Sequence, residues 1–394
     1  MRSKLVGSTL IIAGTTIGAG MLALPLASAG LGFVQSSFIM VAMWLLMSYT
    51  ALLMLEIHQH AHEGATLNSL ARQFLGRKGQ ILATFATLFL LYALCAAYIA
   101  GGGSQLNAKL IAFSNGVLPD SMGTFLFTFI IAGAVMLGTH KVDFINRCLF
   151  LLKIVLLCVS LGLLTPHISM LHLTELPIDQ GLAIAAIPVM FTSFGFHGSI
   201  PSVVAYTGLN IRTLRKVMLF GSSLPLIIYL LWQGVSFGVL SQNSLLNNDQ
   251  LPEFINAMSQ VVTSPYITSV ISLFADLALA TSFLGVSLGL FDFLSDALKR
   301  NNTVSGRLQT GLMTFVPPML IALFYPQGFV AALGYAAIAL VLLAVVLPVL
   351  MARKVRQAKL NRDKYQVFGG NIGLSLAMIG GFTVVASQLA LSIN

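Results

Sequence analysis

The sequence has little charge and very few acidic residues. Only 8 % of its 394 residues are charged, and Asp and Glu together number 12, whereas an ordinary soluble domain has roughly 25 % charged residues. A soluble protein of this length needs a charged surface that this composition cannot supply. The three cysteines, Cys95, Cys148 and Cys158, show no paired spacing. These shortages exclude a cytosolic globular enzyme, a disordered chain and a disulfide-rich secreted domain.

Long apolar runs make up most of the chain, and 57 % of the residues are hydrophobic. A membrane-spanning helix uses about 20 such residues. The runs lack the alternation of a β-strand, so they predict an all-α polytopic membrane protein with eleven spans. The expected spans lie near residues 6–30, 33–57, 80–105, 122–139, 149–165, 182–206, 217–240, 267–295, 309–325, 329–350 and 371–392. No loop between them is long enough for a soluble catalytic domain.

The Lys and Arg residues predict how the chain is oriented. The net charge is +9, but the basic residues form short clusters between apolar runs, which does not favour a nucleic-acid partner. With a cytoplasmic N-terminus and eleven alternating spans, all the clusters face the cytoplasm, and Lys109 alone lies in an outer loop. The clusters lie at 2–4, 72–78, 141–147, 212–216, 299–307 and 353–364. The C-terminus is then expected on the outer side.

Two spans carry helix-weakening residues at mid-membrane. The first has Gly14-Thr15-Thr16-Ile17-Gly18-Ala19-Gly20 followed by Pro25, and the sixth has Thr192-Ser193-Phe194-Gly195-Phe196-His197-Gly198-Ser199 followed by Pro201. Close helix packing at Gly14 and Gly18 is the alternative explanation for the first span alone. Two interrupted spans at the same position of two halves instead point to a transporter site.

The spacing of these two spans predicts a five-plus-five inverted repeat, because an odd number of spans per half inverts the second half. The first repeat covers residues 1–165, the second covers 182–350, and residues 371–392 form an additional helix. Backbone N–H groups freed at one interruption can hold a carboxylate, and freed carbonyls can hold an ammonium group. A site with both poles suits a zwitterion, and an amino acid is the natural candidate.

Three segments resemble a known family. Residues 14–25 (GTTIGAGMLALP), 191–201 (FTSFGFHGSIP) and 274–286 (FADLALATSFLGV) resemble helices one, six and eight of the bacterial hydroxy and aromatic amino acid permeases, with the tyrosine-specific members most similar. The likeness runs from about residue 5 to residue 390. It implies the leucine-transporter fold with helices 1 and 6 discontinuous. It also implies a proton symporter of the bacterial inner membrane that imports an aromatic amino acid, most plausibly L-tyrosine.

The resemblance also implies a set of binding residues. The substrate carboxylate would meet the backbone of Thr16, Ile17, Gly18, Ala19 and Gly20, and the ammonium that of Ser193, Phe194 and Gly195. For the ring, candidates are Phe194 and Phe196 of the sixth span, Tyr92, Cys95 and Ile99 of the third, and Ser282 and Val286 of the eighth. Simple packing is an equal alternative for each side chain. A tyrosine hydroxyl needs a polar partner, for which Asp276, Ser282, Ser287, His197 and Gln233 are open candidates.

Ionisable residues at membrane depth are rare and usually functional. Lys153, Asp276 and His197 are the proton-coupling candidates, in that order. In some proton-coupled relatives a lysine of the fifth helix takes the place of a sodium ion, and Ala278, Thr281 and Ser282 match the lining of that site. The alternative is a lysine that extends to the inner surface, which is also our expectation for Glu56.

The expected partners are therefore an aromatic amino acid, a proton and the lipid bilayer, without a cofactor or an obligatory protein partner. His58, His60 and His62 lack further ligands nearby and do not predict a metal site. Within transport, the alternatives are a tryptophan or broad aromatic permease and a sodium-coupled carrier. An intramembrane enzyme would need a catalytic dyad or metal ligands at a common depth, which the sequence does not offer. A channel would show single-channel conductance instead of stoichiometric coupling.

Overall fold

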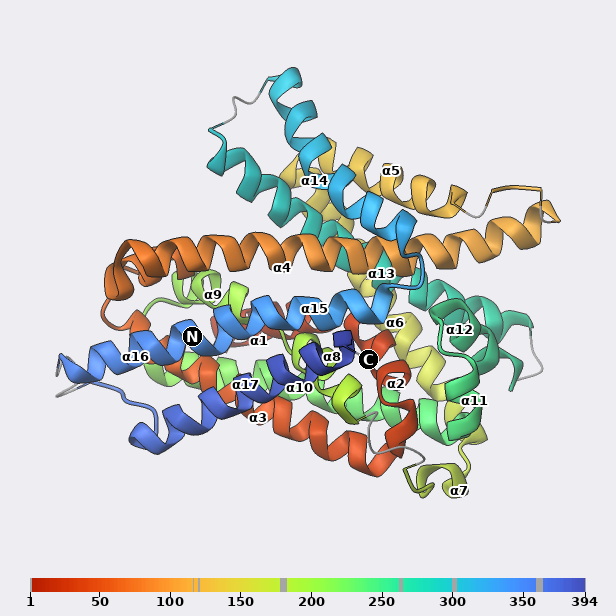
Figure 1. The fold of residues 1–394 in the computed structure, drawn as a ribbon, viewed down its shortest axis with the longest axis horizontal. Coiled ribbons are helices and arrows are strands. Elements are labelled where there is room, and N and C mark those ends of the chain that lie inside the picture. The colour runs from red at the N-terminus through yellow and green to blue at the C-terminus, as the bar shows by residue number, and fades with distance from the viewer. Residues whose placement is uncertain are drawn as a thin grey trace.

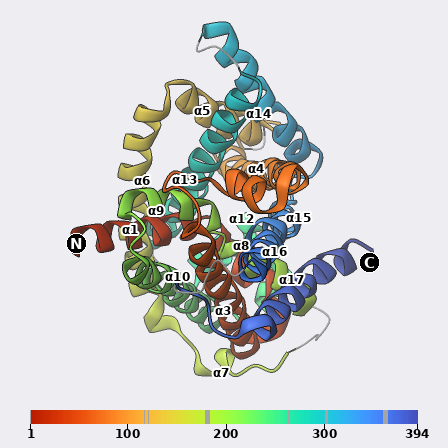
Figure 2. The same cartoon turned by 90° about the vertical axis from the view of Figure 1, so that its left-hand side faces the viewer.

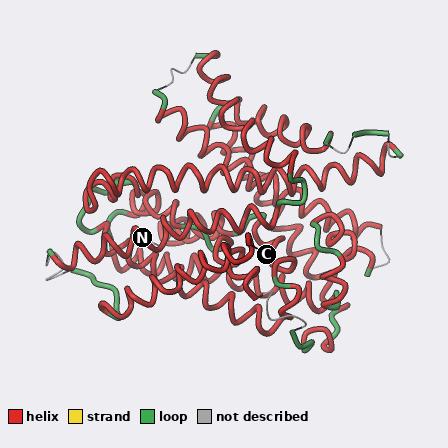
Figure 3. Tube along the Cα trace, viewed as in Figure 1, coloured by secondary structure: helices red, strands yellow, loops and turns green. Residues whose placement is uncertain are grey.

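A computed structural model describes residues 2–115, 117–119, 121–177, 183–261, 265–299, 303–358 and 364–393. Within these ranges every regular element is a helix (Figure 3). Nine of the described helices are long and apolar enough to cross a membrane, and a tenth span forms when the bent pair at the N-terminus is counted as one. The prediction of an all-helical polytopic membrane protein is thus confirmed, because long apolar helices satisfy their own backbone in lipid.

Each expected span has a helix in the structure, but the helices expected near 80–105 and 149–165 begin earlier, at Leu67 and Thr139. The first half contains α1 (Arg2–Thr16), α2 (Gly20–Ala27), α3 (Gly32–His58), α4 (Leu67–Ser114), α5 (Met122–Met136) and α6 (Thr139–Leu164). The second half contains α8 (Ala183–Ser193), α9 (Ile200–Thr207), α10 (Ile211–Val239), α13 (Pro265–Ala297), α14 (Val304–Phe324), α15 (Phe329–Val341) and α16 (Leu347–Gln357), and α17 (Gly370–Ile393) follows. A π-helical turn, Leu342–Val346, joins α15 to α16.

Short helices fill the loops on one side of these spans. They are α7 (Met170–Leu173), α11 (Gln242–Asn247) and α12 (Leu251–Gln260), with single 3₁₀ turns at Ala29–Leu31 and Thr165–His167. The span expected near 122–139 corresponds to α5, an apolar helix of 15 residues that is shorter than the others. Residue 182, where the second repeat was expected to begin, lies outside the described residues, as do Arg300 and the basic residues of 359–363.

Helix α4 runs through the middle of the molecule (Figure 1). Its 48 residues bend at Gly76, whose φ of 72° suits a residue without a Cβ. On one side of α4 lie α5 and α14, and on the other lies the larger group of helices that includes α1, α10 and α3 (Figure 1). Between the two halves, α1 packs against α10 and α3 against α8, while α4 packs against α15 and α6 against α13.

Several loops meet at one end of the bundle. The ammonium of Lys4 lies over the ring of Tyr206, and the guanidinium of Arg215 lies over the ring of Tyr365. Burial of Tyr365 in this cluster raises the pKa of its phenol, while the charge of Arg215 opposes the rise. Figure 2 views the molecule from this side, where α16 ends. The N-terminus, the start of α10 and the segment around Tyr365 therefore lie at one end of the bundle.

Candidate functional site

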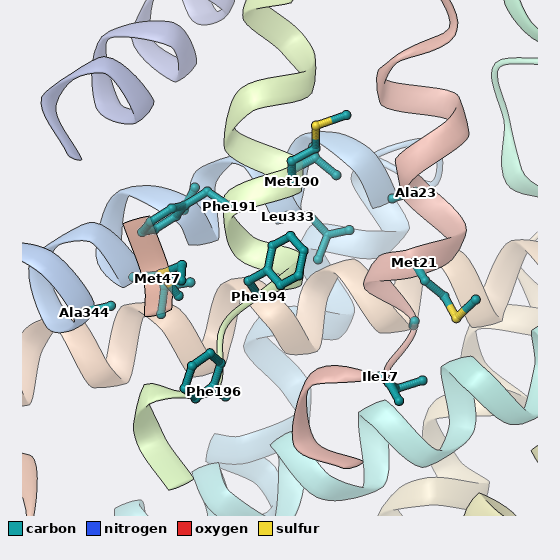
Figure 4. Packing of buried hydrophobic residues seen from close by; sticks show 14 of the residues in the cluster. Ile17, Met21, Ala23, Met47, Met190, Phe191, Phe194, Phe196, Leu333 and Ala344 are labelled. Atoms are coloured by element: carbon teal, nitrogen blue, oxygen red, sulfur yellow. The ribbon is translucent and has the colours of Figure 1, made fainter. Parts of the chain in front are cut away.

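The chain leaves helical geometry at two neighbouring places in the core. The first interruption lies between Thr16, where α1 ends, and Gly20, where α2 begins, and the helix axis bends there by 50°. The second lies between Ser193, where α8 ends, and Ile200, where α9 begins. Because α2 packs against α8, the two interruptions face each other, with Ile17 at the first and Phe194 and Phe196 at the second (Figure 4).

Two glycines allow this close approach. A Cβ on Gly18 would lie 2.8 Å from Oγ of Ser282 on α13, and a Cβ on Gly20 would lie 3.0 Å from Oγ of Ser193. These distances are too short for an added methyl group. The first interruption can therefore pack against both α13 and α8 only because these two residues have no side chain. Glycine here serves approach between elements, in addition to weakening the helix.

Lys153 extends from α6 into the first interruption. Its ammonium donates to the carbonyl of Ile17 at 2.9 Å and to Oγ1 of Thr281 on α13 at 3.2 Å. It also lies 4.5 Å from the centre of the Phe150 ring. The side chain is 2 % exposed, so it does not extend to the surface. One cation thereby connects three helical segments that the sequence places far apart.

The neighbouring Ser282 completes this contact. Its Oγ accepts the backbone N–H of Ala19 at 2.8 Å, which satisfies a donor that the interruption frees. The hydroxyl of Thr281 donates to Leu277 one turn earlier at 2.7 Å, which leaves its oxygen to accept from Lys153. Ala278, the third residue expected in this lining, is fully buried on the same helix.

Tyr229 on α10 is a site residue that the sequence reasoning missed. Its hydroxyl lies 2.6 Å from the carbonyl oxygen of Thr16 and 2.9 Å from that of Ser193. These are the last residues of α1 and α8, so one hydroxyl connects the two interruptions. The signal was present in the sequence: a tyrosine in mid-span carries a hydroxyl that must find a partner inside the protein.

His197 lies within the second interruption and is held by α3. Its Nε2 lies 2.9 Å from Oγ1 of Thr50, and that hydroxyl is also within reach of the carbonyls of Leu46 and Met47. If the hydroxyl donates to a carbonyl, it accepts from Nε2–H, and the lone pair then lies on Nδ1. Nδ1 is buried and has no hydrogen-bond partner within the described part of the chain. In this tautomer His197 keeps a buried proton acceptor.

The other expected lining residues divide into two groups. Phe194 and Phe196 are fully buried, and the Phe194 ring lies 5.3 Å from that of Tyr229. Cys95 and Ile99 on α4 are also fully buried, whereas Val286 on α13 is half-buried. The side chain of Tyr92 points toward α14, because its hydroxyl donates to the carbonyl of Met313 at 2.7 Å. The second interruption thus carries its own aromatic side chains, and Gly195 lies between them.

Two of the expected isolated charges are in fact paired. Asp276 on α13 forms an ion pair with Lys109 near the end of α4, and both side chains are partly exposed. Glu56 was expected to extend to the inner surface, and that expectation is wrong. Its side chain is fully buried, and its two carboxylate oxygens each accept from Arg356 at 2.8 Å. The bidentate hydrogen bonds from Arg356 stabilise the carboxylate inside the protein, so the side chain does not need to extend to water.

Comparison with known proteins places this chain in a family. The model of the tryptophan/tyrosine permease family matches residues 1–388. The chain belongs to that family. Among tryptophan/tyrosine permeases, it is 44 % identical over 394 residues to tyrosine-specific transport system 1 of Haemophilus influenzae, covering 99 % of this chain and 97 % of the relative.

Two further relatives come from the same organism. Tyrosine-specific transport system 2 is 38 % identical, covering 98 % of this chain and 96 % of the relative. A tryptophan-specific transport protein is 34 % identical, with coverage of 99 % and 97 %. The resemblance inferred from three short segments therefore extends along the whole permease. As a member of this family the chain is a multi-pass transporter and not an enzyme.

Proposed function

We propose that this permease imports L-tyrosine together with a proton by alternating access. The observation that carries the proposal is the ammonium of Lys153, which reaches from α6 to Ile17 at the first interruption and to Thr281 on α13. Charge-assisted hydrogen bonds are about twice as strong as neutral ones. Loss of the proton would weaken both contacts, so the position of the first interruption would depend on protonation.

The packing of the helices supports a five-plus-five inverted repeat of the leucine-transporter kind. If residues 1–165 and 182–350 are equivalent halves, the contact of α1 with α10 corresponds to that of α8 with α3, and the contact of α4 with α15 to that of α13 with α6. Each pair has its expected counterpart. We infer that the interrupted spans, with α3 and α10, move against a scaffold formed by α4, α5, α13 and α14, and that 371–392 is an additional helix.

The two interruptions supply the poles for a zwitterion. Around Thr16 to Gly20 the freed N–H groups would bind the substrate carboxylate, and the carbonyls from Ser193 to Gly195 would bind its ammonium. Phe194 and Phe196 would contact the ring, together with the faces of α4 (Cys95 and Ile99) and α13 (Ser282 and Val286). Tyr92 is the weakest member of this set, because its hydroxyl is bonded to α14.

The choice of tyrosine rests on the two relatives that are named tyrosine-specific. Of the five candidates for the hydroxyl partner, Gln233 and His197 fit best. Oε1 of Gln233 and Nδ1 of His197 are buried acceptors without a partner among the described residues, and a phenol could donate to either. Ser287 already donates to Phe283 on its own helix at 2.5 Å. Asp276 is engaged by Lys109.

Lys153 is the first choice for the proton carrier. Asp276 is less suited, since its carboxylate is paired with Lys109 and partly exposed. His197 remains the second choice through its free Nδ1. A sodium-coupled carrier is disfavoured, because the lysine occupies the space between Ile17 and Thr281 where a cation would bind. For location, we infer the bacterial inner membrane, with the N-terminus in the cytoplasm and the C-terminus in the periplasm.

Uptake into proteoliposomes tests these statements together. Radiolabelled tyrosine is offered under a proton gradient and then under a sodium gradient, with unlabelled tyrosine, phenylalanine or tryptophan as competitor. Proton-driven uptake that only unlabelled tyrosine blocks is the expected result. Sodium-driven uptake would make Thr281 and Ser282 cation ligands and leave Lys153 a structural role. Strong tryptophan uptake without tyrosine uptake would keep the coupling argument and overturn the substrate.

A further inference from the structure

Tyr229 contacts two carbonyl groups, but it cannot donate a full hydrogen bond to both at once. Its hydroxyl lies 2.6 Å from the oxygen of Thr16 and 2.9 Å from that of Ser193, and a phenol has a single proton to donate. Both carbonyls belong to the last residues of helices, which have no acceptor role left in their own helix. Two freed carbonyls therefore share one neutral donor.

The surroundings make this sharing consequential. Tyr229 is fully buried, and Thr16 and Ser193 are each 5 % exposed. Water is therefore excluded from the carbonyls in this arrangement, and an unpaired buried carbonyl is costly. The ring of Phe194 packs at 5.3 Å from that of Tyr229. Tyr229 therefore also contacts an aromatic side chain of the second interruption.

An amino acid's ammonium would satisfy the same carbonyls better. It carries three N–H donors and a positive charge, whereas Tyr229 offers one neutral O–H. On the function proposed above, on which this inference rests, the ammonium binds at Ser193. The hydroxyl and the ammonium then compete for that oxygen, and they cannot both donate to it along the same direction.

We propose that Tyr229 is a positioning residue that stands in for the substrate ammonium while the carrier reorients without substrate. When the core closes around the interruptions without an amino acid, the hydroxyl supplies the donor that the carbonyls of Thr16 and Ser193 need. When an amino acid is bound, the three N–H donors of its ammonium supply the carbonyls of both Thr16 and Ser193. Tyr229 therefore lowers the barrier for return of the empty carrier, and the loaded carrier does not depend on it.

Tyr229→Phe tests the proposal by removing one oxygen and leaving the ring. Net uptake requires the empty carrier to return, so it should slow by about tenfold, the effect expected for one unpaired buried carbonyl. Exchange of labelled for unlabelled tyrosine involves only the loaded carrier and should stay within about twofold of wild type. Tyr325→Phe, at an exposed position beyond α14, is the matched control and should change neither rate.

Two further readouts separate this role from others. The pH dependence of the accumulation ratio should be unchanged in Tyr229→Phe, because the proposed proton carrier is intact. In detergent, tyrosine should raise the melting temperature of the variant more than that of wild type, since the substitution destabilises the empty form and not the loaded form. If exchange falls as much as net uptake, or if tyrosine binding weakens, Tyr229 is a substrate ligand and the proposal is wrong. A variant that fails to fold even with excess tyrosine also overturns it.

Failure of the proposed function would be visible in the wild-type protein. Wild type that does not exchange tyrosine contradicts the tyrosine assignment, and the same comparison is then made with tryptophan, which carries the same ammonium. The stand-in role concerns the amine and not the ring, so the difference between net uptake and exchange is expected for either amino acid. Equal losses of both rates in Tyr229→Phe, measured against an active wild type, contradict the inference alone.

Discussion

The two interruptions are held in different ways. The first is fixed by side chains from distant helices: Lys153 on α6 bonds Ile17, and Ser282 on α13 bonds Ala19. The second is held by neutral side-chain contacts, from His197 to Thr50 and from Ser199 to Thr15. Both interruptions contain tight backbone turns, such as Met21 N–H to Gly18 and Phe194 N–H to Phe191. Tyr229 on α10 also links the two.

This difference indicates a division of work. A segment fixed by a cation changes its anchorage when that cation loses its proton, so the first interruption suits proton coupling. The side-chain contacts of the second interruption, His197 with Thr50 and Ser199 with Thr15, carry no fixed charge. Such contacts do not depend on a proton held by a cation, so the second interruption suits recognition of the substrate. The following predictions test this division, beginning with the largest effect.

Replacing Lys153 by Ala should abolish pH-driven accumulation of substrate and leave part of the exchange activity. The change removes the charge that bonds Ile17 and Thr281, but it leaves the carbonyls of the second interruption intact. Accumulation ratios at several pH gradients measure the effect. Lys216→Ala, an exposed lysine on α10, is the control. Accumulation that still follows the pH gradient in Lys153→Ala would remove the lysine from the coupling mechanism.

Glu56→Gln should reduce the stability of the permease without altering its coupling. The variant leaves the Arg356 guanidinium without its bidentate counter-charge, and breaking one side of a buried ion pair costs about 3 kcal/mol or more. Thermal unfolding in detergent measures the loss, with the exposed Glu63→Gln as control. A changed pH profile of transport would show that buried charge away from the interruptions also takes part in coupling.

Gly18→Ala should slow transport by about tenfold, since forcing a methyl group into a packed contact costs on the order of 1–3 kcal/mol. The new Cβ would meet Oγ of Ser282 at 2.8 Å and disturb the hydrogen bond from Ala19. Initial uptake rates measure the change. Adding Ser282→Ala removes the colliding oxygen and should restore part of the rate. A double variant slower than Gly18→Ala would show that transport depends more on the hydrogen bond from Ala19 to Ser282 than on relief of the collision.

Thr50→Val should have the smallest effect. It leaves Nε2 of His197 without its partner, which costs about 1–3 kcal/mol of stability for a buried donor. Transport rates should stay within about threefold of wild type, because the second interruption keeps its backbone turns. Melting temperature and uptake are measured on the same preparation. A shifted pH profile of uptake would instead make His197 the proton carrier.

Much of this arrangement could be predicted from the sequence. The spans were predictable because apolar runs of membrane length have one structural solution in lipid. The interruptions were predictable because Gly18 and Gly20, and then Gly195, stand where a helix would otherwise continue. Lys153 was recognisable as a candidate for coupling because a charge at membrane depth is costly unless it is used.

The partners of these residues could not be predicted with the same assurance. Periodicity shows which face of a helix a residue occupies, but not what lies opposite. The sequence thus offered no reason to pair Asp276 with Lys109, and it predicted the wrong environment for Glu56, whose partner Arg356 is 300 residues away. Tyr229 went unnoticed because a single tyrosine in an apolar span resembles ordinary packing.

The sequence by itself determined that this chain is a multi-pass helical membrane protein with two weakened spans, because these properties depend on local composition and on the lipid solvent. Its place among the permeases came from resemblance to known sequences. Only the tertiary structure decided that Lys153 meets Ile17, that Ser282 meets Ala19, and that one hydroxyl of Tyr229 touches both interruptions. These contacts join helices from distant parts of the chain. Their geometry is set by how the whole bundle packs, which no short segment specifies.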